Sequence, residues 1–343
     1  MPTARVLECP AFGLDNLRLT TREIGEPGPG EVRLRLDAAS LNRRDLLLVE
    51  GVYNPKQKLP VVPCSDGAGV VEAIGPGVGR VAVGDRVALH FFTGWISGEP
   101  TTEKLATALG GPGGDGTLAE RMIVSAEAVV KLPDSIDTVT AATLPCAALT
   151  AWSAIVDLGR VRPGDTVLIQ GTGGVSLFAL QFAVRAGARV IGLTSSPERA
   201  AVMRRLGATE VINYREVPKW ASAVRDLAGG RLDLVVEVGG AETLDQSVRC
   251  VRPGGTVALI GVLSGNFATV NLSLAVMRQV RLQGVTCGDR EAFEAMLRAI
   301  AVEPIDPVID GRFPLAEAGA AFARMKADGH VGKIVIDLAG DAP

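Results

Sequence analysis

Four small residues, Gly171-Thr172-Gly173-Gly174, form a turn of the kind that binds phosphate. They follow the apolar, β-branched run 166–169, which predicts a buried strand. They precede a largely apolar stretch from Val175 to Ala186, which predicts a buried helix that ends at Gly187. Glycines let the backbone approach an anion, and the free N–H groups and positive end of the helix face it. This arrangement predicts that the turn holds the pyrophosphate of a dinucleotide.

The turn fills the fingerprint G-x-G-x-x-G with Gly171, Gly173 and Ser176, so the third position departs from glycine but stays small. A second strand expected at 188–194 completes a βαβ unit, and this context strengthens a motif that is weak alone. The alternative is a glycine turn that holds a buried helix against a sheet without any ligand.

A second polar set lies at the end of that next strand, about 20 residues after the glycines, where an acid binds the ribose diol of NAD. Here the chain has Ser195, Ser196 and Arg199, whose hydroxyls and cation suit the 2′-phosphate of NADP. Glu198 follows Pro197, which places it in the first helical turn, pointing away. The alternative role for the serines is to cap this helix.

Length and charge limit the classes of function. At 343 residues the chain is long for a single core, so two domains are expected. A formal net charge of −3 without a basic run argues against a nucleic-acid partner. No segment resembles a signal peptide and no apolar run reaches transmembrane length, so we expect no membrane association and a cytoplasmic location.

The numbers and spacing of cysteines and histidines limit the kinds of catalytic and metal site that the chain can form. The five cysteines are scattered without a C-x-x-C pair, which is typical of reduced thiols rather than of a disulfide framework or a structural zinc site. There are only two histidines, His90 and His330. With so few histidines, a catalytic mechanism that pairs a histidine with a nucleophilic serine or cysteine is not favoured.

The elements that must position these residues change along the chain. Residues 1–126 are rich in short strands and glycine turns, which predicts a compact, partly closed β domain. In residues 127–288 strands and helices alternate, which predicts a parallel sheet with helices on both faces. The tail, 289–343, is expected to return to the first domain. Further expected strands are 31–36, 69–75, 210–213, 234–238, 256–261 and 333–338, and expected helices are 197–206, one beginning near Thr243, 291–300 and 315–328.

Seven short motifs carry a resemblance over nearly the full length. The chain is similar to the medium-chain dehydrogenase/reductase superfamily, and within it to the zinc-independent, quinone oxidoreductase-like branch and to NADP-dependent alcohol dehydrogenase-like proteins. The resemblance implies an α/β fold: a Rossmann doubly wound parallel sheet at 127–288 plus a GroES-like partly closed β-barrel domain at 1–126 and 289–343. The motifs are Pro29-Gly30-Glu31-Val32, Asn42-Arg43-Arg44-Asp45, Gly67-Ala68-Gly69-Val70-Val71, Val83-Gly84-Asp85-Arg86-Val87, Leu149-Thr150-Ala151, Gly171-Thr172-Gly173-Gly174-Val175 and Gly332-Lys333-Ile334-Val335.

The resemblance also frames the question of a metal. Zinc-dependent relatives place a cysteine, a histidine and a second cysteine where this chain has Asn42, Ser65 and Cys146. Asparagine and serine are poor zinc ligands, so we expect no metal site. One alternative is a rearranged metal site formed by Cys64, Cys146 and Asp66. The other is that these cysteines are small buried residues that bind no metal.

The family implies roles for further residues. Asn42 and Tyr53 match positions that face the nicotinamide, and they are the candidate catalytic residues. Their alternative roles are a turn-stabilising amide for Asn42 and a rim aromatic on the loop 51–55 for Tyr53. Asp45 is expected to be structural. The candidate cofactor-binding residues are Thr150, Gly171, Thr172, Gly173, Gly174, Val175, Ser195, Ser196, Arg199, Tyr214, Gly239, Gly261, Val262 and Leu263.

Without a metal, hydride must go to an acceptor that is polarised by hydrogen bonds or already electron-poor. The implied activity is therefore NADPH-dependent reduction of a quinone or an α,β-unsaturated carbonyl. The alternatives are an NADP-dependent alcohol dehydrogenase or ketone reductase, and a redox-responsive NADPH-binding protein with little turnover. The partners expected are a small-molecule carbonyl or quinone substrate and a second copy of the chain, paired through the edge at 267–285.

Overall fold

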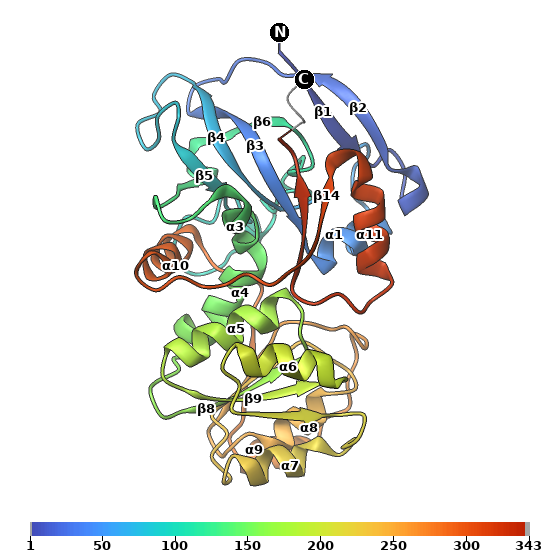
Figure 1. Ribbon diagram of the computed structural model, residues 1–343, viewed down its shortest axis with the longest axis vertical. Helices are drawn as coiled ribbons and strands as arrows, with labels where there is room; N and C mark the ends of the chain where they lie inside the picture. Colours follow the sequence, from blue (N-terminus) through green and yellow to red (C-terminus); the bar gives the residue numbers. More distant parts are fainter. Residues whose placement is uncertain (1, 340–343) are drawn as a thin grey trace. The chain divides into compact units, whose positions relative to one another are not determined.

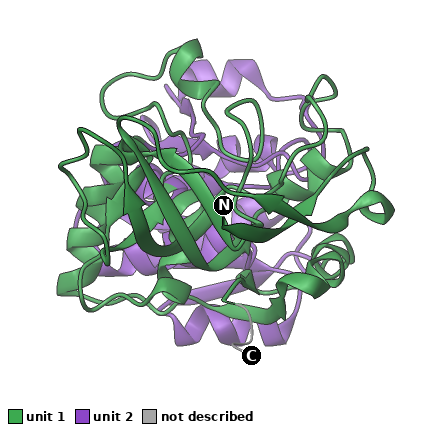
Figure 2. Ribbon diagram, turned by 90° about the horizontal axis from the view of Figure 1, so that it is seen from above, with its two compact units in different colours: residues 1–149, 289–343 green, residues 150–288 purple. Residues whose placement is uncertain are grey.

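A computed structural model describes residues 2–339. The chain forms two compact units, Met1–Leu149 with Asp289–Pro343 and Thr150–Gly288, which Figure 2 shows in green and purple. We call them the first and the second unit. Among the described residues, no helix is both long and apolar enough to span a membrane.

The second unit is built on one parallel sheet of six strands, in the order β10-β9-β8-β11-β12-β13. Helices α5 and α6 lie on one face of this sheet, and α7, α8 and α9 on the other (Figure 1). The strands are β8 (Thr166–Gln170), β9 (Arg189–Thr194), β10 (Glu210–Asn213), β11 (Leu234–Glu237), β12 (Thr256–Leu259) and β13 (Arg281–Gly284). The helices are α4 (Leu149–Trp152), α5 (Gly174–Arg185), α6 (Pro197–Arg205), α7 (Trp220–Leu227), α8 (Leu244–Cys250) and α9 (Leu272–Met277).

Local signals explain how these elements begin and end. All five residues of β8 are buried, as expected for a central strand covered on both faces. Helix α6 begins after Ser196, whose side chain accepts a hydrogen bond from the Arg199 N–H, with Pro197 in its first turn. Gly207 follows the helix with φ 107°. The expected alternation of strands and helices is therefore confirmed.

The first unit contains a two-stranded sheet, β1-β2, and a seven-stranded sheet with the order β14-β15-β3-β4-β5-β7 and β6 paired to β3. The long strand β3 has three partners, so the sheet wraps around a buried core that includes Leu34, Leu36 and Phe322. Its strands are β1 (Thr3–Glu8), β2 (Arg18–Glu23), β3 (Glu31–Leu41), β4 (Asp66–Ile74), β5 (Arg86–Leu89), β6 (Arg121–Ser125), β7 (Val129–Lys131), β14 (Ile309–Pro314) and β15 (Lys333–Asp337). Its helices are α1 (Arg43–Val49), α2 (Thr102–Leu105), α3 (Thr138–Ala142), α10 (Arg290–Val302) and α11 (Ala318–Lys326).

The first junction between the units falls at 149/150, later than the 126/127 expected from the sequence. The reason is β7, which pairs with β5 and so keeps the next segment in the first unit. A strand of three residues followed by a short helix gives little periodic signal. The tail returns to the first unit, where β15 pairs with β3.

Three neighbouring strands of the first unit bring polar residues to one end of the sheet. Strand β15 begins at Lys333, β3 ends at Leu41, and β4 begins at Asp66. Since β3 is antiparallel to both neighbours, the start of β15, the end of β3 and the start of β4 coincide. Residues far apart in the sequence therefore meet just where α1 begins.

Candidate active site

The predicted phosphate-binding turn lies between β8 and α5. Gly171 has φ 72°, a left-handed conformation that favours glycine. Gly173 precedes α5 with φ −74°, and a Cβ added there would meet no atom within 4 Å. Internal packing does not require glycine at this position, so the open space suits a bound group. Thr172 is buried, while Gly174 and Val175 are partly exposed in the first turn of the helix.

Ser176, at the third fingerprint position, ties the helix to the strand. Its Oγ donates a 2.6 Å hydrogen bond to the backbone oxygen of Gln170, and the residue is buried. Glycine at this position of the fingerprint serves close packing of helix and strand. Here a hydroxyl small enough to be accommodated adds a bond across the same contact.

A fully buried carboxylate, Glu237, binds both the residue before the phosphate-binding turn and the turn at Gly239. Its Oε1 accepts from the backbone N–H groups of Gly239 at 2.8 Å and Gly240 at 3.0 Å, and from Thr243 Oγ1 at 2.5 Å. Its Oε2 accepts from Gln170 Nε2 at 2.8 Å and from Ser247 Oγ. Glu237 thus links the residue before Gly171 to the turn at Gly239, and both turns are on the candidate list.

Two residues of the polar set after β9 contact each other, and the third caps a helix. Arg199 Nη1 donates to Ser195 Oγ at 3.3 Å, while Ser196 caps α6. The exposed Glu198 carboxylate accepts a hydrogen bond from Ser196, which lowers its pKa. Tyr214 follows β10, where its backbone N–H donates to Thr194 O at 2.9 Å, and it is 40% exposed. The strand pairing therefore places Tyr214 close to the serines.

The remaining candidates of the second unit lie either in the exposed segment that begins at Gly261 or in the buried helix α4. A Cβ at Gly261 would lie 2.4 Å from Val238 O, so close backbone approach requires glycine there. Val262 and Leu263 follow with 48% and 63% of their surfaces exposed. Thr150 is buried in α4, with 3% exposed.

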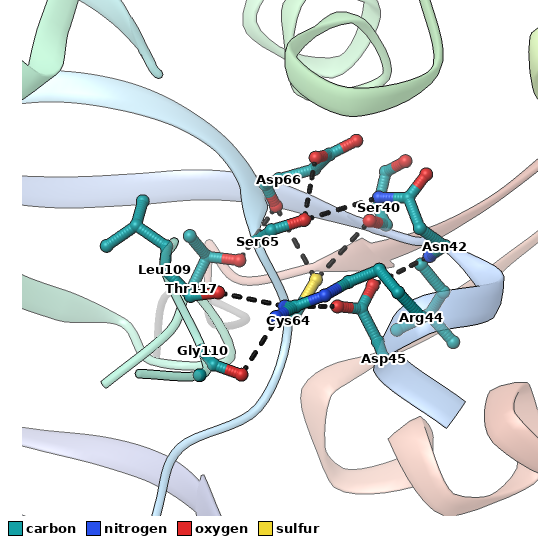
Figure 3. Close-up of polar contacts among 12 residues, drawn as sticks. Ser40, Asn42, Arg44, Asp45, Cys64, Ser65, Asp66, Leu109, Gly110 and Thr117 are labelled. Atoms are coloured by element: carbon teal, nitrogen blue, oxygen red, sulfur yellow. Dashed lines mark hydrogen bonds and ion pairs between the residues drawn. The ribbon is translucent and has the colours of Figure 1, made fainter. Parts of the chain in front are cut away.

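In the first unit, Asn42 belongs to a buried polar network at the end of the three strands (Figure 3). Lys333 Nζ donates to Asn42 Oδ1 at 2.6 Å and to Leu41 O at 2.9 Å, and it lies 3.3 Å from Asp66 Oδ2. Ser65 Oγ donates to Asp66 Oδ1 at 3.1 Å and lies 3.5 Å from Asn42 Nδ2. Asn42 therefore contacts an ammonium group on one side of its amide and a hydroxyl on the other.

A second ion pair holds the start of α1. Asp45 Oδ2 accepts from the Asn42 backbone N–H at 2.7 Å, and Asp45 Oδ1 lies 3.0 Å from Arg44 Nη1. Arg44 Nη1 also donates to the backbone oxygens of Leu109 and Gly110 (Figure 3). Burial raises the pKa of Asp45, although the Arg44 charge opposes this shift. These contacts give Asp45 the structural role expected from the sequence.

Tyr53 is connected to the same ion pair. The Arg44 guanidinium carbon lies 4.9 Å from the centre of the Tyr53 ring, within the range of a cation–π contact. The Tyr53 backbone N–H donates to Leu47 O at 3.0 Å, and 47% of the residue is exposed. The phenol is thus supported on one face and accessible.

The residues of the alternative metal site have other contacts. Cys64 has φ 81°, and its Sγ donates to the backbone oxygen of Ser40 at 3.3 Å. Burial raises the pKa of this thiol, which disfavours the thiolate that a metal requires. Over the described residues, no group of three or more His, Cys, Asp and Glu side chains could hold a metal ion. None of the cysteines forms a disulfide.

Two polar residues central to these networks were not among the sequence candidates. Lys333 belongs to the motif Gly332-Lys333-Ile334-Val335, which assigns it no role, and Glu237 is the next-to-last residue of the expected strand 234–238 and the last residue of β11. The sequence feature that could have pointed to both residues is a charged residue at one end of an apolar strand. Such a residue is often exposed, whereas these two are 3% and 0% exposed.

Two family models match the chain. One is described as zinc-binding dehydrogenase and covers residues 174–302, and the other as alcohol dehydrogenase GroES-like domain and covers residues 28–134. The latter match identifies the first unit as GroES-like, and the sheet of the second unit gives the expected α/β fold.

Relatives and solved structures match over nearly the whole chain. A zinc-type alcohol dehydrogenase-like protein of Schizosaccharomyces pombe is 39% identical, covering 95% of this chain and 96% of that protein. A quinone oxidoreductase of Pseudomonas aeruginosa is 34% identical (91% and 92% covered), and a 2-haloacrylate reductase of a Burkholderia species is 30% identical (94% and 96%).

The fold comparison gives the same grouping. A structure assigned as an alcohol dehydrogenase of Sinorhizobium meliloti 1021 has a TM-score of 0.92 at 37% identity, with 98% of this chain and 99% of that one covered. An NAD-dependent alcohol dehydrogenase has a TM-score of 0.88 at 34% identity (97% and 99%). A mycobacterial protein in complex with NADPH has a TM-score of 0.82 at 30% identity (97% and 99%). The chain belongs to the medium-chain dehydrogenase/reductase superfamily of oxidoreductases.

Proposed function

We propose that this enzyme reduces quinones or α,β-unsaturated carbonyl compounds with NADPH and without a metal ion. The observation that carries the proposal is the network at Asn42. At two positions where zinc-dependent relatives have ligands, the chain has Asn42 and Ser65, and Asn42 is hydrogen-bonded to a buried ammonium group. Polarisation of the substrate must then come from hydrogen-bond donors.

The residues of the second unit fit a dinucleotide with a 2′-phosphate. The open turn at Gly171–Gly174 suits the pyrophosphate, because the α5 N–H groups are free there. Ser195 and Arg199 already contact one another, and their donors suit the extra phosphate. One structural relative carries NADPH and another is NAD-dependent, so the choice of cofactor rests on these residues.

When bound, the reduced nicotinamide supplies a hydride. The Asn42 amide would donate to the acceptor's carbonyl oxygen, where negative charge develops as the β-carbon gains the hydride. The Tyr53 phenol, held over Arg44, would protonate the α-carbon of the resulting enolate. A quinone or an enone meets this demand because its conjugated carbonyl delocalises the charge, and the name of the 2-haloacrylate reductase relative also describes an activated alkene.

The experiment that tests this function is a substrate panel of quinones, enones, ketones and alcohols, run with the purified enzyme after dialysis against a chelator. We expect quinones and enones to be reduced by NADPH at a rate that added zinc does not raise. Deuterated NADPH should place its label on the β-carbon of an enone. About one zinc ion per chain, lost together with activity, would contradict the metal-free mechanism.

Tyr53→Phe tests the proton donor. If the phenol is the sole donor, kcat should fall by roughly ten- to a thousandfold, with a smaller loss if water replaces it. Tyr214→Phe removes the chain's other phenol, which belongs to the proposed cofactor site of the second unit, so it should change the affinity for NADPH rather than kcat. Faster oxidation of alcohols than reduction of enones, under matched conditions, would support the alcohol dehydrogenase alternative, and binding of NADPH without turnover would support the redox-responsive protein.

We also propose that the enzyme is a homodimer that pairs through β13. This strand is at the edge of its sheet, and all four of its residues are exposed. The segment that precedes β13 carries three apolar residues that are between 74% and 95% exposed, Phe267, Leu272 and Met277. Light scattering should give a dimer for the native chain and a monomer for Met277→Asp. A native monomer at micromolar concentration would contradict the proposal.

A further inference from the structure

Lys333 is an unusual lysine because it is 3% exposed and every proton of its ammonium group has a partner. The acceptors are Asn42 Oδ1 at 2.6 Å, Leu41 O at 2.9 Å and Asp66 Oδ2 at 3.3 Å. A buried ammonium is costly unless it is paired and hydrogen-bonded. This one is satisfied, and its shortest contact is with a neutral amide rather than with the carboxylate.

The contact determines which way the Asn42 amide is turned. An ammonium group has only donors, so the amide atom facing it must be the oxygen. The NH₂ end of the amide must therefore point to the other side. There its distance to Ser65 Oγ is 3.5 Å, at the long limit of a hydrogen bond, which leaves the amide with donor capacity for another group.

The charge of Lys333 also changes the strength of that donor. A cation that binds the oxygen of an amide draws electron density away from its nitrogen, and consecutive hydrogen bonds in a buried site reinforce each other. Asp66 balances the charge, but it lies 0.7 Å farther from Nζ than the amide oxygen does (3.3 against 2.6 Å). The polarising effect on Asn42 is therefore retained.

We propose that Lys333 is a positioning residue that orients and polarises the Asn42 amide, so that Asn42 Nδ2 stabilises the negative charge that forms on the acceptor's carbonyl oxygen during reduction. The inference rests on the proposed function, because it assigns to Lys333 the polarisation that a metal ion supplies in metal-dependent enzymes. Lys333 acts through Asn42 and does not itself touch the substrate.

A double-mutant cycle between Lys333 and Asn42 tests this coupling. Lys333→Met and Asn42→Ala should each lower kcat by about tenfold or more, the size expected from removing one charge-stabilising donor. KM for NADPH should stay within twofold, since its proposed site is in the second unit. The double variant should be about as slow as either single variant. Multiplying losses would overturn the proposal. Lys326→Met, at an exposed lysine paired with Glu50, is the control and should leave kcat unchanged.

Lys333→Met leaves Asp66 buried without its cation, so the single variant is accompanied by Lys333→Met/Asp66→Asn. This pair removes both charges and should restore thermal stability, yet kcat should stay about tenfold low because the polarising cation is absent. Recovery of kcat together with stability would show a merely structural role and overturn the proposal.

A measurement without turnover separates this inference from the proposed function. The side-chain ¹⁵N–¹H signals of Asn42, assigned from their loss in Asn42→Ala, should move upfield in Lys333→Met/Asp66→Asn, because the amide loses its cation. Unchanged signals would overturn the inference even if enones are reduced. Moved signals in an enzyme that reduces neither enones nor quinones would support the amide orientation while the proposed function fails.

Discussion

Both units contain fully buried carboxylates, and two of these, Asp66 and Glu237, are neutralised in different ways. Asp66 in the first unit lies 3.3 Å from the Lys333 ammonium group and forms an ion pair. Glu237 in the second unit accepts from neutral groups: two backbone N–H groups, two hydroxyls and an amide. Both carboxylates are 0% exposed, so burial alone does not account for the difference.

The difference follows from what surrounds each carboxylate. Glu237 holds loop backbone in place, and neutral donors are sufficient because each N–H or O–H makes a directed bond to the charge. Asp66 balances a cation that in turn contacts the side chain of Asn42, so the first unit keeps a positive charge next to a candidate catalytic group. We infer that the second unit uses its buried charge to shape a binding surface, and the first uses its pair to set the electrostatics of a reaction.

Asp66→Ala should have the largest effect on stability, because it leaves the Lys333 ammonium buried without its carboxylate. Breaking such a pair costs about 3–5 kcal/mol. Urea unfolding followed by Trp95, in a Trp152→Phe/Trp220→Phe background, would report on the first unit alone. Glu26→Ala, which removes a partner that is 74% exposed, is the control and should cost less than about 1 kcal/mol. Equal losses in the two variants would show that the Lys333 pair is not stabilising.

Glu237→Ala should destabilise the second unit by about 3 kcal/mol, because several buried donors lose their acceptor at once. It should also weaken NADPH binding by roughly tenfold, since the Gly239 turn is no longer held. Trp220 fluorescence in a Trp95→Phe/Trp152→Phe background and calorimetric titration would measure the two effects. Glu210→Ala, at an exposed position on β10, provides the baseline. Unchanged affinity despite lost stability would separate Glu237 from the cofactor site.

Arg199→Ala should reduce the affinity for NADPH by roughly tenfold or more and leave that for NADH nearly unchanged. The reason is the loss of a charge-assisted bond to the 2′-phosphate, typically about 1.5–3 kcal/mol. Arg204→Ala changes an exposed arginine in the last turn of the same helix and controls for net charge. If both cofactors lose affinity equally, Arg199 is not the phosphate ligand.

The two carboxylates also show where prediction from the sequence succeeds and where it does not. Helix α6 could be predicted because Ser196, Pro197 and Gly207 act on their immediate neighbours. The contact between Lys333 and Asn42 spans 291 positions and depends on the register of β15 on β3, to which no local pattern points. The sequence therefore allows candidate residues to be proposed at glycine turns, whereas the buried charges that support those turns are visible only in the structure.

Ser176 gives the smallest expected effect and the sharpest test of the turn in the second unit. The fingerprint has glycine at this position, yet Ser176 Oγ donates to the backbone oxygen of Gln170 at 2.6 Å, and the side chain of Gln170 in turn donates to Glu237. Ser176→Ala should cost about 0.5–1.5 kcal/mol from the lost bond. Ser176→Gly, which completes the fingerprint, should cost roughly 1 kcal/mol more, because glycine lowers helix stability.

Both Ser176 variants should bind NADPH nearly as well as the native enzyme, because the hydroxyl is buried against β8 rather than directed to the open side of the turn. Urea unfolding and calorimetric titration on the three proteins give the order of stability and of affinity. If the glycine variant proves more stable than the alanine variant, helix propensity does not govern this position, and close packing of α5 on β8 does. A large loss of NADPH affinity in Ser176→Ala would instead place the hydroxyl among the cofactor ligands.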